Sequence, residues 1–151
     1  MKRFSRSMQG VTLLEIMLVL AVAAMIIVMS VRYYQSATSS QQVNSTLEQI
    51  QAISAAADGI AQGTNSYASV KTSGIQPMMP NQSMATAWGT DITVAGTSAT
   101  EYTVTITGVP YAVCSQVVPK IQANNKFTTS STCATGNATT ITYTYNSQAG
   151  G

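Results

Sequence analysis

The sequence predicts an α+β protein in which one long N-terminal helix packs on a small antiparallel β-sheet. Three observations predict this class. Glu15 is the only charge in the largely apolar stretch 11–31, residues 33–62 repeat apolar side chains with helical spacing, and three later segments alternate threonine with large apolar residues. Helical spacing places side chains on one face of a helix, whereas strict alternation gives a strand one apolar face. We therefore expect a membrane-length helix, its amphipathic continuation, and a sheet that covers the amphipathic face.

The first predicted element is a transmembrane and assembly helix over residues 11–32. The 21 residues from Val11 to Val31 would extend about 31 Å as a helix, which is enough to cross the hydrocarbon core of a bilayer. Basic residues precede the apolar run, and such residues stay on the cytoplasmic side of a membrane. Arg32 ends the run, so we expect most of the chain to lie outside the cytoplasm.

The helix is expected to continue as an amphipathic half over residues 33–62. No proline occurs between Val11 and Ile60. Apolar residues recur at steps of three and four, at Val43, Leu47, Ile50, Ile53, Ala57 and Ile60. The opposite face is rich in glutamine and asparagine, as in a helix that is buried on one side. The whole helix would have roughly 50 residues and a length of about 75 Å.

The remaining residues, 63–151, are expected to form a globular α+β head. Residues 64–90 are rich in Ser, Thr, Asn, Gly and Pro, which predicts a loop with a short helical turn. Alternation of apolar and threonine residues then predicts strands over residues 92–94, 101–107 and 141–145. The apolar face of this sheet needs a partner, and the amphipathic half of the helix is the obvious one.

Two segments of the head have less regular patterns. Residues 112–122 predict a short second helix, in which Pro119 must either occupy the first turn or break the helix. Residues 124–140 are nearly all polar and predict a loop.

Glu15 is the most informative residue of the chain. A carboxylate inside a membrane segment is costly, about 2.5–3.5 kcal/mol for an Asp at a helix centre, so something should neutralise it. Cleavage after Gly10 would give Val11 a free ammonium group four residues away. Identical chains stacked side by side would then pair the Glu15 of one with the Val11 amine of the next. The pattern predicts that Glu15 serves assembly.

The run GVTLLEIMLVLAVAAMIIVMSV, preceded by Lys2, Arg3 and Arg6, resembles the class III signal and transmembrane start of a type IV prepilin. The resemblance is tight over residues 5–32. It implies that residues 1–10 are a leader peptide, which a prepilin peptidase removes after Gly10. It also implies that Val11 becomes the N-methylated first residue of the mature chain and that Glu15 is the fifth-position glutamate of the family. A valine at position 11 favours the type IVb class, whose leaders are often longer than ten residues.

Two other interpretations of the N-terminus explain its hydropathy. One is an ordinary secretory signal peptide, and the other is a plain single-pass anchor. The first does not account for a charge at Glu15 within the apolar run or for the lack of a clear small-x-small cleavage site. The second leaves Gly10 and Glu15 without a purpose.

Cys114 and Cys133 are the only cysteines of the chain. Outside the cytoplasm, two cysteines are expected to form one disulfide bond. Eighteen residues lie between them, for which the chain-entropy model gives about 3 kcal/mol of stabilisation. A disulfide loop near the carboxyl end is similar to the D-region of pilins. Because the chain has no histidine and no C-x-x-C motif, we predict no metal or redox site.

Composition argues against an enzyme. Without histidine the chain can form neither a Ser-His-Asp triad nor a Cys-His pair, and it contains no glycine-rich nucleotide-binding loop. We therefore predict no catalytic activity and no cofactor. Loss of residues 1–10 would leave four basic and five acidic side chains. Lys120 and Lys126 alone do not predict a nucleic-acid partner.

The sequence thus predicts the major structural subunit of a type IV pilus, of the type IVb class. Its expected partners are copies of itself, the prepilin peptidase, the assembly machinery of the inner membrane, and a receptor on a host or other cell. It would reside in the inner membrane before assembly and in an extracellular filament afterwards, serving adhesion or aggregation. The alternatives are a pseudopilin of a type II secretion system and a minor pilin. No Asp or Glu follows Glu101 to supply the calcium site known in the major pseudopilin.

Overall fold

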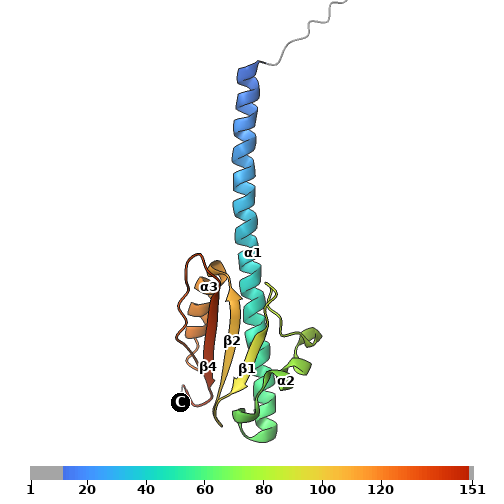
Figure 1. Ribbon diagram of the computed structural model, residues 1–151, viewed down its shortest axis with the longest axis vertical. Coiled ribbons are helices and arrows are strands. Elements are labelled where there is room, and N and C mark those ends of the chain that lie inside the picture. Colours follow the sequence, from blue (N-terminus) through green and yellow to red (C-terminus); the bar gives the residue numbers. More distant parts are fainter. Residues whose placement is uncertain (1–11, 150–151) are drawn as a thin grey trace, which may run out of the picture. The chain divides into compact units, whose positions relative to one another are not determined.

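Helix α1 runs without interruption from Leu13 to Thr64 and is followed by a four-stranded antiparallel sheet, so the predicted α+β class is confirmed (Figure 1). The computed structural model describes residues 12–149. The chain forms two compact units that meet between Thr38 and Ser39. Each unit is described by itself below.

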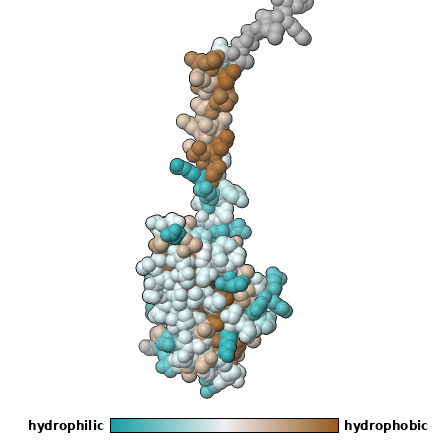
Figure 2. Space-filling model, viewed as in Figure 1, coloured by the Kyte–Doolittle hydropathy of each residue, from teal (hydrophilic) through white to brown (hydrophobic). Residues whose placement is uncertain are grey.

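The first unit contains the N-terminal part of α1, which is apolar all round. Its large apolar side chains are exposed, from 49% for Ile16 to 76% for Leu13. Figure 2 shows this surface as a continuous hydrophobic stretch. A soluble monomer rarely exposes a contiguous apolar surface of this size. The segment therefore needs lipid or other protein around it.

The second unit contains the sheet, whose strand order is β1-β2-β4-β3. The strands are β1 (Ile92–Gly96), β2 (Glu101–Val109), β3 (Phe127–Thr129) and β4 (Thr139–Asn146). Strands β1, β2 and β4 are those that the alternation predicted, each extended by a few residues. Their register aligns the apolar residues across the sheet, with Ile92 opposite Ile106, Val104 opposite Tyr143, and Tyr102 opposite Tyr145. One face of the sheet is therefore apolar, and the other carries mainly threonine.

The core forms where the second part of α1 packs on this apolar face. Most of the predicted helical stripe is buried, namely Val43, Ile50, Ile53 and Ala57. Leu47 and Ile60 are half-buried at the edge of the core. Helix α3 (Tyr111–Gln122) adds five buried residues to the same core: Val113, Cys114, Val117, Val118 and Ile121.

Pro119 lies inside α3, so both expectations for this residue were wrong. It is the ninth residue of the helix, which neither starts nor breaks there. Proline removes the N–H that would donate to the carbonyl of Ser115, four residues earlier. Both residues are on the exposed side of α3. Water can therefore satisfy this carbonyl, while the opposite side of the helix stays packed.

Two segments that were expected to be loops contain regular structure. Strand β3 lies within residues 124–140 and pairs with the end of β4. Residues 64–90 form four short helical segments, more than the single turn expected: η1 (Tyr67–Ser69), α2 (Thr72–Ile75), η2 (Gln76–Met78) and η3 (Pro80–Gln82). Buried Val70, Ile75 and Met79 hold this region against the core.

Gly96 allows η1 to approach the end of β1. Its N–H donates to the carbonyl of Val70 at 2.7 Å. A Cβ atom on Gly96 would collide with the carbonyl oxygen of Tyr67 and would lie 2.7 Å from that of Ala68. Because both atoms belong to the backbone, a larger residue cannot be accommodated by a side-chain rotation.

We predict that Gly96→Ala lowers the free energy of unfolding by about 1–3 kcal/mol, since η1 would have to move away from β1. Chemical denaturation of the full chain in detergent, followed by the fluorescence of the single Trp88, measures this change. The matched control is Gly59→Ala on the exposed side of α1, where a Cβ meets nothing within 4 Å. That change should stabilise the helix by about 0.5–1 kcal/mol. Equal effects of the two substitutions would contradict the close-approach argument.

Candidate functional site

The first turn of α1 joins two polar residues near the start of the apolar run. The N–H of Glu15 donates to the carbonyl oxygen of Thr12 at 3.0 Å and to its Oγ1 at 3.3 Å. Thr12 therefore caps the helix, and Glu15 is its third residue. A carboxylate at this position interacts favourably with the positive end of the helix dipole.

Thr12 is a residue that the sequence reasoning missed. The signal was present, because Thr-x-x-Glu before an apolar run is the capping-box spacing. Gly10 and Val11 lie outside the described residues, so cleavage after Gly10 and methylation of Val11 stay predictions. The role of Glu15 in assembly also stays a prediction. Glu15 is exposed, and its carboxylate makes no ion pair with any residue in the described range 12–149.

Helix α1 is long and apolar enough to cross a membrane. No residue in the most apolar stretch of this helix, near the N-terminus, is buried. These properties are consistent with membrane anchoring or with a signal sequence near the N-terminus.

Cys114 and Cys133 form a disulfide bond, as the sequence predicted, with Cα atoms 5.8 Å apart. Cys114 is buried in α3, and Cys133 is half-buried in the connection from β3 to β4. The bond does not close a simple loop, because residues 115–122 belong to α3. The bond instead anchors the β3–β4 connection to a packed helix.

An aromatic cluster lies on the apolar face of the sheet near the C-terminal end of α1. The ring of Tyr102 stacks on those of Tyr67 and Tyr145, with centroids 5.6 and 4.9 Å apart. Phe127 contacts Tyr145 and, edge to face, Tyr143. Such aromatic pairs each contribute about 0.5–1.5 kcal/mol beyond the area that they bury. The cluster therefore helps to hold η1 and β3 to the centre of the sheet.

The hydroxyl groups of Tyr102 and Tyr143 are shielded from water. Burial raises the pKa of Tyr102 and of Tyr143. Burial also raises the pKa of Tyr67, whose hydroxyl donates to Oδ1 of Asp58 at 2.7 Å. A negative phenolate would be poorly solvated at these positions and would be repelled by the carboxylate. Tyr67 therefore remains a hydrogen-bond donor to Asp58 at neutral pH.

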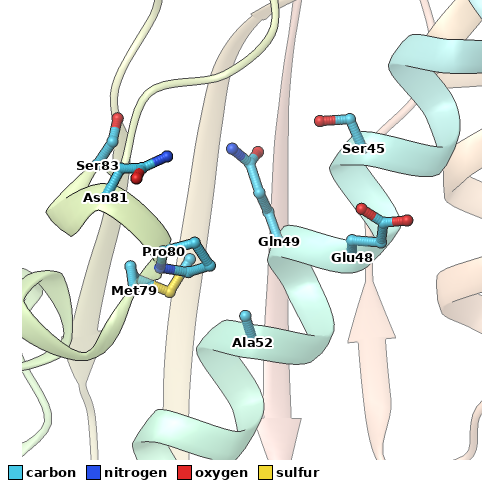
Figure 3. A pocket seen from close by; sticks show the side chains of 8 residues that line it. All are labelled: Ser45, Glu48, Gln49, Ala52, Met79, Pro80, Asn81 and Ser83. Atoms are coloured by element: carbon cyan, nitrogen blue, oxygen red, sulfur yellow. The ribbon is translucent and has the colours of Figure 1, made fainter.

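A hollow of about 330 Å³ separates α1 from the loop around η3 (Figure 3). Figure 3 shows Gln49 pointing from α1 toward the loop that carries Asn81 and Ser83. The Nε2 of Gln49 donates to the carbonyl of Ala85 at 2.8 Å. Glu48 is the one charged residue that lines the hollow. The residues from 12 to 149 contain no group of three His, Cys, Asp or Glu side chains placed to hold a metal ion.

Comparisons of the chain with protein-family models, with curated proteins and with solved structures found no match. The class of protein therefore rests on the architecture. A long apolar N-terminal helix, a small antiparallel sheet packed on it and a disulfide bond are together compatible with the pilin fold and with a pilin-like surface subunit.

We predict that the free energy of unfolding falls as the pH rises above 10. Tyr143 has an ordinary pKa of 10.0 when unfolded and a higher one when folded. Above pH 10 the unfolded chain therefore loses a proton that the folded chain keeps. The loss should approach about 1.4 kcal/mol per pH unit for each such tyrosine. Urea unfolding followed by circular dichroism at several pH values measures the slope.

The matched variants are Tyr143→Phe and Tyr111→Phe. The hydroxyl of Tyr143 has no hydrogen-bond partner, so its removal should leave the fold intact and reduce the slope. Tyr111 is 45% exposed, and its removal should leave the slope unchanged. If the Tyr143 variant keeps the full slope, burial of this hydroxyl is not the cause.

Proposed function

We propose that this protein is the major structural subunit of a type IV pilus, of the type IVb class. The observation that carries the proposal is an exposed apolar segment of α1 whose first turn holds a single carboxylate, Glu15, shortly after the predicted cleavage site. A membrane anchor alone would need the apolar residues and not the charge. The disulfide-linked head and its largely uncharged surface suit an extracellular setting.

In this proposal the apolar part of α1 has two successive roles, first as a membrane span and then as a packing surface between subunits. Before assembly, lipid surrounds the apolar side chains of α1. After the peptidase has removed residues 1–10 and the assembly machinery has extracted the chain, the same side chains pack against those of other subunits. Lipid is as apolar as these side chains, so close packing supplies the specificity of the bundle.

Glu15 would set the axial position of each subunit. The carboxylate of Glu15 makes no hydrogen bond or ion pair with any residue in the range 12–149, so it is available to a neighbouring chain. A free amine on Val11 of that neighbour is a fitting partner, because an ionised pair is less costly in an apolar bundle than a lone carboxylate. A subunit displaced along the bundle axis would leave both charges unpaired.

We predict that Glu15→Gln gives a chain that is still processed but forms at least about tenfold fewer filaments, because the amide keeps the shape of the side chain and loses the charge. Filaments sheared from cells that express each variant are quantified, and their subunits are analysed by intact-mass and N-terminal-peptide mass spectrometry. The wild-type subunit should begin at N-methylated Val11 and contain the Cys114–Cys133 bond. Glu48→Gln, an exposed charge removal later in α1, is the matched control and should assemble normally.

Different outcomes separate the parts of the proposal. Normal filaments from the Glu15 variant would disprove the pairing with Val11. A wild-type chain found only in the membrane fraction would indicate a pseudopilin or a minor pilin. A chain that retains residues 1–10 would overturn the prepilin interpretation altogether.

A further inference from the structure

A second and larger hollow, about 490 Å³, opens at the C-terminal end of α1. Its walls come from the end of this helix, from η1 and from the neighbouring ends of the sheet. Asp58 and Gln62 line it from the helix, Tyr67 from η1, and Lys126 and Tyr145 from the residues around β3 and β4. Chain segments distant in sequence thus place two opposite charges and two tyrosines in one groove, which we call the polar groove.

Planar polar side chains form one wall of the polar groove. Asp58 and Gln62 are four residues apart, which places them on one side of the helix, and Asn65 lines the same hollow just after the helix ends. Asn65 has a φ of 52°, the left-handed conformation common just after a helix. The side chains of Gln62 and Asn65 make no hydrogen bond to any described residue. Their amide groups are therefore available to a ligand.

Tyr67 fixes the carboxylate and supplies an apolar surface. Its hydroxyl donates to Oδ1 of Asp58 at 2.7 Å, which orients the carboxylate and leaves Oδ2 free to accept. The ring of Tyr67 is half-buried, and Tyr145 beside it is nearly covered, at 6% exposed. The groove therefore offers one partly exposed aromatic ring next to an ordered acceptor.

Lys126 supplies the positive charge of the polar groove. Its side chain is exposed and makes no ion pair with the residues that the structure describes. With Asp58 it gives the groove one charge of each sign. Such a groove disfavours a polyanion, which Asp58 would repel, and it allows a ligand that carries a single carboxylate among many hydroxyl groups.

We propose that the polar groove binds an acidic saccharide, with one uronic acid residue seated between Asp58 and Lys126. Adjacent hydroxyl groups of a pyranose donate to and accept from planar side chains, which Asp58, Gln62 and Asn65 provide. The C–H face of the sugar ring packs on Tyr67, as apolar surfaces do on aromatic rings. Lys126 pairs with the carboxylate of the sugar. The inference goes beyond the filament proposal and does not depend on it.

The test is isothermal titration calorimetry of the full chain in lauryldimethylamine oxide micelles, a detergent without a sugar headgroup. The probe is the methyl glycoside of galacturonic acid, which carries one carboxylate, and the reference probe is its methyl ester, which has the same hydroxyl groups and no charge. We expect the acid to bind and the ester to bind about threefold more weakly, as befits one exposed ion pair.

Four variants locate the binding. Asp58→Asn keeps the shape of the side chain and an acceptor for the hydroxyl of Tyr67. It should lower the affinity for both probes about tenfold. Asn65→Gly keeps the left-handed backbone and should also weaken both. Lys126→Gln should remove the difference between acid and ester. Lys120→Gln, an exposed lysine of α3 outside the groove, is the matched control and should bind as the unmodified chain does.

Two results would overturn the inference. One is no binding of the methyl glycoside of galacturonic acid at about 10 mM, which corresponds to less than about 3 kcal/mol of binding free energy. The other is that the groove binds Nα-acetyl-lysine amide and not the saccharides, and that Asp58→Asn abolishes this binding. The groove would then be a site for basic peptides. Because no filament is used, either result leaves the pilus proposal untouched.

Discussion

The head depends on the contact between one face of α1 and the apolar face of the sheet. Ile53 and Ala57 of the helix are fully buried, as are Tyr102 and Val104 of the central strand β2. The small side chains of Ala56, Ala57 and Ala61 lie on the same face of α1 and allow close packing. Strand β1, helix α3 and the short helices after residue 64 all pack around this contact. A fold that lost it would have no other continuous core among the residues described.

Hydroxyl side chains, rather than ion pairs, hold the surrounding loops in place. Oγ1 of Thr72 accepts from the N–H of Val94 and donates to its carbonyl, which fastens α2 to β1. Oγ of Ser131 likewise accepts from the N–H of Thr142 and donates to its carbonyl, which fastens the segment after β3 to β4. Each such bond adds about 0.5–1.5 kcal/mol net and is insensitive to salt. Between residues 12 and 149, a protein with 8% charged residues thus secures these connections with hydrogen bonds and without ion pairs.

The two proposals use different chemistry in different parts of the chain. Assembly is assigned to an apolar helix with one carboxylate in its first turn, and specificity there comes from a single charge in a medium that tolerates few. Saccharide binding is assigned to an open groove of the second unit, where several weak polar contacts would act together. Only the second arrangement required the tertiary structure, because its residues range from position 58 to position 147.

The sequence by itself determined the helix, three of the four strands and the partners in the disulfide bond. Periodicity is a local property of the sequence, and two cysteines allow only one pairing within the chain. Both can therefore be interpreted without knowledge of the fold. Strand β3, the continuation of α3 through Pro119 and the need for glycine at position 96 were decided by tertiary structure. Each depends on a neighbour distant along the chain, such as β4 beside Phe127 or Tyr67 beside Gly96. The polar groove belongs to the same group, since only folding brings Lys126 to the end of α1.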